Sequence, residues 1–347
     1  MLIVNDPLDD LGHEDPGHPE RPDRLVAVRH AIAQLDLGGD QVNVAARAAT
    51  RTELAAVHEG AYLDELGAFC YEGGGDIDED TYATYDSWAL AQVAAGAGLV
   101  VVDELRRRGE GVGFVSVRPP GHHALADRAM GFCLLNNVAI AAAALRRDGE
   151  RVLIVDWDVH HGNGTQTIFW NDPDVLYVST HQWPLFPGSG VASEVGGPRA
   201  LGATLNLPLP AGATGDVVRR ALDEVAAPVI EEFAPTWVLV SAGFDGHLAD
   251  PMADFALSSG DFARLASWAA SFAPRDGRLA FFLEGGYDLT ALRDSVTATL
   301  AAALGDSMAS EGETSGGPGE EQIRRSMRER ASTLELVRGQ LADEAAP

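Results

Sequence analysis

Three polar side chains, Asp156, Asp158 and His160, follow a short apolar run in the sequence. That run, residues 151–154, is apolar and rich in β-branched residues, which predicts a buried strand with the polar group just past its carboxyl end. Alternation along the strand direction places the three side chains on one side. Two carboxylates and an imidazole that converge in this way suit a divalent cation with open coordination positions. Because buried carboxylates are costly without a compensating cation, we favour a metal site over a polar loop without function.

Other predicted strands end in residues that suit the same site. Ligands of open α/β sheets bind at the carboxyl ends of the strands, so side chains from several strand ends are expected to meet there. Adjacent histidines on a loop stiffened by proline and glycine suit an acid and a base, because imidazole titrates near neutrality. The predicted strands and the residues that follow them are 113–117 with His122 and His123, 236–240 with Asp245, and 279–283 with Tyr287.

Predicted strands and helices alternate along the chain, which favours a mostly parallel open sheet with helices on both faces. The acidic, glycine-rich stretch 72–80 is expected to be a loop, either a flexible connection or a rim that meets a cationic substrate. Further strands are expected over 174–180 and 204–207, and helices over 25–35, 51–69, 87–108 and 215–233. Two more helices are expected, one that ends near Arg147 and one that follows the strand at 279–283 and ends at about Leu304.

The composition changes after residue 305. We therefore predict one domain over residues 1–305 and a linker with a charged tail over 306–347, helical in propensity from 323 to 341. The tail is a peripheral helix, an oligomer contact or disordered.

The chain has 347 residues and a net charge of −27, and all 25 of its basic residues are arginine. An acidic surface repels nucleic acid and attracts cationic small molecules or basic peptides, although adaptation of the source explains the charge equally well. Two cysteines without CxxC spacing exclude a disulfide framework. No apolar run approaches the roughly 18 residues of a membrane span, and Met1 to Asp10 lacks the pattern of a leader, so we expect a cytoplasmic protein without a membrane partner.

Six motifs, in this order, resemble those of the histone deacetylase superfamily, and within it the class II-like bacterial deacetylases and acetylpolyamine amidohydrolases. The resemblance covers about residues 10–300 and implies the open α/β arginase-deacetylase fold. The motifs are HxxxxHPExPxR from His13 to Arg24, RPPGHHA from Arg118, GFCxLNN from Gly131, DxDxHHGNGT from Asp156, SAGFD from Ser241 and EGGYD from Glu284.

The resemblance also implies a role for each matching residue. Asn163 stands where some members of the superfamily have a second aspartate, so His123 has no carboxylate partner there. The metal, Zn²⁺ or Fe²⁺, would be held by Asp158, His160 and Asp245. The catalytic group would be His122, His123 and Tyr287, with Asp156 and Asn163 as partners of the histidines. The substrate would contact Gly131, Phe132, Phe186 and Gly285, and a monovalent cation such as K⁺ would lie near Asp156, Asp158, His160 and Ser179.

The implied reaction is hydrolysis of an acetyl amide to acetate and a free amine, on an acetyl-lysine peptide or an acetylated cationic small molecule such as a polyamine. A deacylase for another acyl group and a non-catalytic module that binds acetylated ligands remain alternatives, and a homo-oligomer stays open. A binuclear ureohydrolase is disfavoured, because it needs a second cluster of aspartates and histidines where this chain has RPPGHHA and Tyr287.

Overall fold

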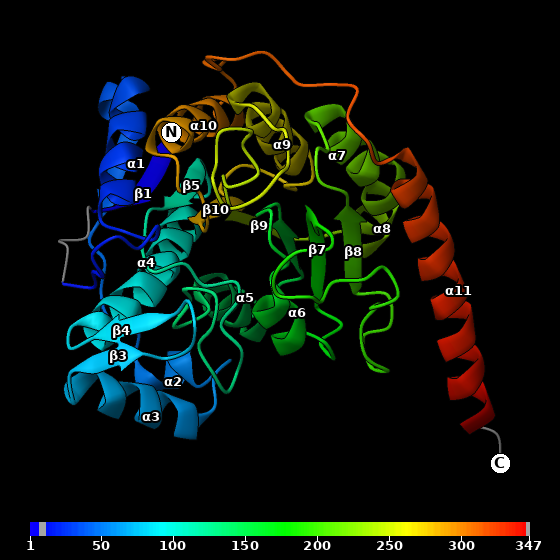
Figure 1. Ribbon diagram of the computed structural model, residues 1–347, viewed down its shortest axis with the longest axis horizontal. Helices are drawn as coiled ribbons and strands as arrows, with labels where there is room; N and C mark the ends of the chain where they lie inside the picture. Colours follow the sequence, from blue (N-terminus) through cyan, green and yellow to red (C-terminus); the bar gives the residue numbers. More distant parts are fainter. Residues whose placement is uncertain (7–11, 345–347) are drawn as a thin grey trace.

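The computed structural model describes residues 1–6 and 12–344; residues 7–11 and 345–347, which include part of the segment 1–10 and the end of the predicted tail, lie outside the described residues (Figure 1). An eight-stranded sheet with the order β2-β1-β5-β10-β9-β6-β7-β8 forms its centre, and all neighbouring strands are parallel. The strands are β1 (Leu2–Asn5), β2 (Gln41–Val44), β5 (Val112–Val115), β6 (Val152–Asp156), β7 (Val175–Gln182), β8 (Thr204–Leu209), β9 (Trp237–Ala242) and β10 (Leu279–Leu283).

The central strands consist of buried side chains along their whole length, as in β6 with the sequence VLIVD. Strands covered on both faces need such continuous apolar runs, because neither face meets water. The register aligns the carboxyl ends: Asp156 at the end of β6 pairs with Ser179 of β7 and with Ser241 of β9. The loops that follow these strands therefore start from the same edge of the sheet.

Helices cover both faces of the sheet (Figure 1). On one side α1, α10 and α9 pack in series, and on the other α4 packs against α5. The longer helices are α1 (Asp23–Gln34), α3 (Gly60–Tyr71), α4 (Ser87–Arg108), α5 (Asn137–Arg147), α9 (Ser259–Ser271), α10 (Leu289–Ala303) and α11 (Glu320–Glu344). The shorter ones are α2 (Arg51–Leu54), α6 (Asn163–Ile168), α7 (Gly215–Ala221) and α8 (Ala227–Phe233), with a π-helical turn, η2 (Leu222–Ala226), between the last two and a 3₁₀ turn, η1 (Gly38–Asp40), after α1.

Helix α4 is long and apolar enough to cross a membrane, contrary to the expectation from its sequence, with a mean hydropathy of 1.4 over its most apolar 18 residues. Of that window, 67% is buried inside the protein. Contacts with β1, β5 and α5 account for the apolar composition, since the side chains that pack against the sheet and a neighbouring helix need not be polar.

Two local predictions differ from the structure. The helix expected over 51–69 is two helices, because Thr50 and Glu53 form a capping box for α2 and a new helix starts at Gly60. The stretch 72–80 contains β3 (Gly74–Asp76), which pairs with β4 (Tyr82–Thr84) in a separate two-stranded sheet, so it is more than a loop. Strands β1 and β2 and helix α9 were not anticipated from the sequence.

The segment after α10 contacts the rest of the chain. Arg330 of α11 is buried and donates to the carbonyl oxygens of Thr204 and Gly202, beside the edge strand β8. Ile323 on the same face of α11 is also buried. The tail helix thus covers one edge of the sheet, while the division of the chain after residue 305 stays a prediction.

Candidate active site

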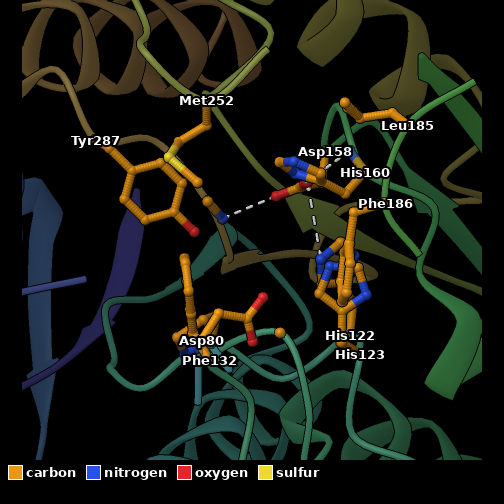
Figure 2. A pocket seen from close by; sticks show the side chains of 13 residues that line it. Asp80, His122, His123, Phe132, Asp158, His160, Leu185, Phe186, Met252 and Tyr287 are labelled. Carbon is orange, nitrogen blue, oxygen red and sulfur yellow. Dashed lines mark hydrogen bonds and ion pairs between the residues drawn. The ribbon is translucent and has the colours of Figure 1, made fainter. Parts of the chain in front are cut away.

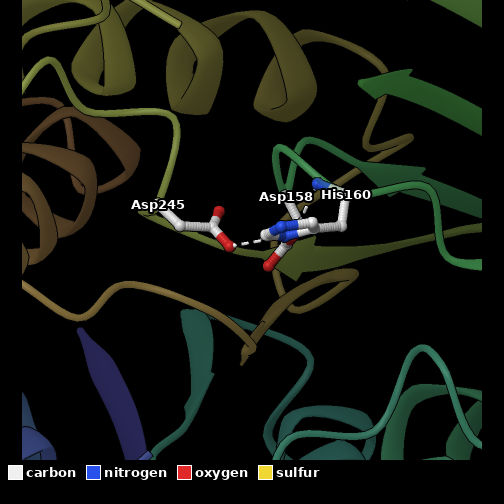
Figure 3. Close-up of side chains that lie close together, drawn as sticks. All are labelled: Asp158, His160 and Asp245. Atoms are coloured by element: carbon white, nitrogen blue, oxygen red, sulfur yellow. Dashed lines mark hydrogen bonds and ion pairs between the residues drawn. The ribbon is translucent and has the colours of Figure 1, made fainter. Parts of the chain in front are cut away.

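Asp158, His160 and Asp245 meet just beyond the carboxyl ends of β6 and β9 (Figure 3). One donor atom from each lies within 4.8 Å of the other two. His160 Nδ1 is 3.2 Å from Asp158 Oδ1 and 3.1 Å from Asp245 Oδ2. All three side chains are buried, so the structure brings together the three metal ligands that the sequence suggested.

The electrostatics of this cluster fit a bound cation. Burial and the charge of Asp158 raise the pKa of Asp245 to about 7. Although burial opposes the protonated form of His160, Asp158 and Asp245 raise its pKa to about 10, so the cluster draws positive charge to the point where the three side chains meet, as a proton on His160 or as a bound cation. Carboxylate oxygen and imidazole nitrogen are also the donors that Zn²⁺ and non-haem Fe²⁺ accept, and three protein ligands leave positions open for substrate.

A glycine next to this cluster makes the close approach of the chain feasible. The Gly285 amide donates to Asp158 Oδ2 at 2.8 Å. A Cβ atom at this position would collide with the carboxylates of both Asp245 and Asp158. Gly285 therefore lets the loop after β10 pass directly beside the metal ligands.

The tandem histidines differ in their partners. His122 Nδ1 is 3.0 Å from Asp156 Oδ2, and its Nε2 is 3.7 Å from Asp158 Oδ1. Although burial opposes the protonated form, the two carboxylates raise the pKa of His122 well above its usual value. His122 is therefore held as an imidazolium by its surroundings.

His123 has an amide as its partner. Its Nδ1 lies 2.8 Å from Asn163 Oδ1, and the Asn163 amide nitrogen contacts the sulfur of Met130 at 3.3 Å. The amide oxygen can only accept, so His123 carries its proton on Nδ1 and presents an unprotonated Nε2. Burial, together with the nearby charges of His122 and His160, lowers the pKa of His123 well below its usual value. Its neutral form is therefore available as a base.

Tyr287 lies on the loop between β10 and α10, across the site from the histidines (Figure 2). Its ring packs edge-on against Phe132 at 5.7 Å, and the Arg24 guanidinium lies 4.9 Å from the ring centre. Burial raises the pKa of Tyr287 well above its usual value. The hydroxyl thus stays protonated and can donate a hydrogen bond.

These residues line a cavity of about 180 Å³ (Figure 2). Phe132 and Phe186 are among its walls, and the Phe186 ring is edge-on to His123 at 5.1 Å. The lining residues are Asp80, Pro120, His122, His123, Gly131, Phe132, Asp158, His160, Leu185, Phe186, Met252, Gly285 and Tyr287. All four residues suggested as substrate contacts, Gly131, Phe132, Phe186 and Gly285, are in this group.

Asp80 and Met252 also line the cavity, and neither was singled out from the sequence. Asp80 ends the acidic stretch for which a substrate rim was one of two interpretations. Met252 lies on the loop that leaves Asp245, and nothing in its sequence context distinguishes it from a core methionine. Burial raises the pKa of Asp80.

Ser179 lies beside Asp156 in the register of β7 and β6. Its hydroxyl is buried and pairs with His181 Nδ1 at 2.9 Å. The monovalent cation expected near this residue stays a prediction.

The first motif of the sequence contributes a buried ion network that supports the site. Glu20 accepts hydrogen bonds from Arg118 at 2.9 Å and from Arg24 at 3.2 Å. Arg24 in turn donates to the carbonyl oxygen of Gly286 at 2.7 Å, next to Tyr287. Burial disfavours the carboxylate, yet the two arginines lower the pKa of Glu20 to about 2. The network ties the amino-terminal loop to the loop that carries the tyrosine.

A parallel sheet with a buried Asp-His-Asp cluster, a histidine pair and a tyrosine at its carboxyl edge defines a metal-dependent hydrolase. Comparison with known proteins identifies the family of hydrolases: residues 18–303 match the histone deacetylase domain. The chain belongs to the histone deacetylase family, with the arginase-deacetylase fold, and is a deacetylase.

Individual relatives agree with this assignment. The chain is 40% identical to histone deacetylase 14, chloroplastic, of Arabidopsis thaliana over 327 residues, which cover 87% of this chain and 76% of the relative. It is 37% identical to a histone deacetylase-like amidohydrolase of Pseudomonas aeruginosa over 279 residues, 78% of this chain and 73% of the relative. The crystal structure of the HDA15 HD domain superposes with a TM-score of 0.86 at 34% identity and covers 97% of this chain and 99% of that chain.

Proposed function

We propose that this deacetylase hydrolyses the acetyl amide of an acetylated aminoalkyl chain, as in acetyl-lysine or an acetylated polyamine, with a divalent zinc ion held by Asp158, His160 and Asp245. The observation that carries the proposal is the cavity of about 180 Å³, which has two metal ligands, the histidine pair and Tyr287 in its wall. The products are acetate and a free amine.

When bound, the metal supplies Lewis-acid activation of the acyl carbonyl and of the attacking water. His123, neutral with Nε2 free, takes the proton of that water and returns it to the leaving amine. His122, held protonated by Asp156 and Asp158, stabilises the negative charge that develops beside it. The hydroxyl of Tyr287 donates to the carbonyl oxygen as it becomes an oxyanion, which contributes about 3 to 4 kcal/mol to transition-state stabilisation.

The cavity wall combines aromatic surface with a carboxylate, which favours a substrate that has both methylene groups and a cationic group. Phe132 and Phe186 present aromatic surface to methylene groups. Asp80 adds a carboxylate to the lining, and the net charge of −27 attracts cations over a longer range. Acetyl-lysine and acetylated polyamines share this pattern, so both are candidate substrates.

The test is kcat/KM of the zinc-loaded protein on an acetyl-lysine peptide and on N-acetylputrescine or acetylspermidine, assayed side by side. Tyr287→Phe serves as the blank, since it removes one hydroxyl and should lower kcat by about 10² to 10³. Metal removal with a chelator should abolish turnover, and added zinc should restore it. Preference between the two substrates then identifies a peptide or a polyamine enzyme.

The alternative of a non-catalytic binding module makes a different prediction in the same assay. It expects equal binding of the acetylated ligand by the native protein and Tyr287→Phe, with no acetate released by either. The complete set of metal ligands, histidines and tyrosine favours the enzyme. If the zinc-loaded protein turns over none of the acetyl substrates, the remaining hypotheses are a deacylase for longer acyl groups and the non-catalytic binding module.

A further inference from the structure

The segment 310–317, here called the strap, crosses the amino ends of α7 and α9 (Figure 1). Thr314 Oγ1 donates to Asp261 Oδ2 at 2.7 Å and accepts from the Gly215 amide at 2.9 Å. A Cβ atom at Gly260 would lie only 2.6 Å from the Glu311 carbonyl oxygen. The strap therefore packs closely on the domain, although its composition is that of a linker.

The strap contacts the loop 246–257, which follows the metal ligand Asp245 in the chain. Its two arms are joined where Leu257 donates to the Gly246 carbonyl at 3.1 Å and Leu248 donates to the Leu257 carbonyl at 2.8 Å. Between the arms, one carboxylate oxygen of Asp250 accepts from the amide of Tyr287 at 2.6 Å. The loop thus connects the metal ligand to the backbone of the tyrosine.

His247 is the side chain through which the strap holds this loop. Its Nδ1 accepts from the Ala249 amide at 3.1 Å, so Nε2 carries the proton and donates to Glu311 Oε2 at 2.9 Å. The same Glu311 oxygen accepts from the Ser259 amide at 2.9 Å. His247 is buried, with 4% of its side chain exposed, whereas the side chain of Glu311 is 41% exposed, so the buried imidazole takes its acceptor from the surface side of the strap.

The strap also reaches the other arm of the loop. Ser258 Oγ donates to the Gly312 carbonyl at 2.7 Å, directly after Leu257. Both ends of the loop are therefore fastened to adjacent residues of the strap. A loop fixed at both ends has fewer conformations, and so do the groups that it carries.

We propose that Glu311 is a positioning residue: through His247 the C-terminal strap fixes the loop that joins the metal ligand Asp245 to the backbone of Tyr287. The proposal rests on the proposed function, because it assigns the strap a role in metal retention and in placing the hydroxyl. Small displacements of such groups have large kinetic consequences, since a misplacement of 1 Å can cost about 10² in rate.

The test compares Glu311→Ala with Glu311→Gln in the full-length, zinc-loaded protein. The amide oxygen of glutamine can accept from both His247 and Ser259, whereas alanine offers no acceptor. We expect Glu311→Ala to lower kcat about tenfold with little change in KM and to speed zinc release to a chromophoric chelator. Glu311→Gln should restore both properties to near the native values.

Glu313→Ala is the matched control, because Glu313 lies on the same strap and its carboxylate pairs with Arg219 and Arg264, whose side chains are partly exposed. It should leave kcat and zinc release unchanged. If Glu311→Ala does not fold, Glu311→Asp, which withdraws the carboxylate by one methylene, replaces it. Equal kcat and equal zinc release in the Glu311 variants and the control would overturn the proposal and make the strap a stability element. Zinc release needs no turnover, so it tests the strap even if the native protein proves inactive on acetyl substrates.

Discussion

His122 and His123 are neighbours in sequence and in space, with ring centroids 4.0 Å apart, yet the protein drives their pKa values in opposite directions. His122 faces the carboxylates of Asp156 and Asp158, which outweigh burial and favour its protonated form. His123 faces an amide, and burial together with its charged neighbours favours its neutral form. Two groups whose surroundings separate their pKa values in this way are suited to divide the acid and base roles.

Asn163→Asp should move the acid limb of the kcat/KM profile to higher pH. A carboxylate near Nδ1 favours the protonated imidazole of His123, and the base is then lost at higher pH. We expect the ratio of kcat/KM at pH 6 to kcat/KM at pH 8.5 to be about tenfold lower in Asn163→Asp than in the native enzyme. Asn163→Ala is the control, since it removes the hydrogen bond without adding a charge and should not shift the limb upward. An unshifted limb in Asn163→Asp would argue against His123 as the base.

Asp80→Asn should weaken binding of cationic substrates in particular. The variant keeps the shape of the side chain and removes its charge, so KM for an acetylated polyamine should rise about fivefold, the equivalent of about 1 kcal/mol for a partly exposed ion pair. KM for an uncharged acetyl amide should stay the same. Glu79→Gln, an exposed acid outside the cavity lining, is the comparison variant. Equal effects of both variants would assign the charge dependence to the general field of the surface.

Acid should destabilise the fold through Glu20. Its pKa of about 2 in the folded protein lies below the ordinary value of 4.5, so its contribution is complete above pH 4.5 and is lost as the pH falls toward 2. Glu20→Gln leaves two buried arginines without a carboxylate and should cost about 3 to 5 kcal/mol of unfolding free energy at pH 7. The difference from the native protein should narrow between pH 5 and pH 3, as measured by thermal unfolding.

Glu53 supplies the control for this prediction. Hydrogen bonds from Arg47 and Thr50 also lower its pKa to about 2, but its pair with Arg47 lies at the surface. Glu53→Gln should therefore change stability by only a few tenths of a kcal/mol, because water screens an exposed ion pair. A large, pH-dependent loss in this variant would show that the acid transition is not specific to the buried network.

The sequence by itself determined the parts of the site that depend on local order. Apolar runs followed within a few residues by Asp158, His160, Asp245 or Tyr287 predict strand ends with polar side chains, and a parallel sheet collects strand ends at one edge. The motifs then gave these residues their expected roles. Helix α4 was predicted with its correct bounds because its apolar stripe is long and uninterrupted.

Only the tertiary structure decided which distant segments meet. The strand order, with β10 between β5 and β9, places Tyr287 opposite the histidines, and no local pattern encodes that order. The contacts of Asp80 and Met252 with the cavity and of Glu311 with His247 likewise join residues far apart in the chain. From the sequence alone, Asp80 lies in an expected loop, Met252 is not distinguished from a core methionine, and Glu311 lies in an expected linker. Such contacts depend on how the helices and strands pack against one another, and local periodicity and composition do not predict that packing.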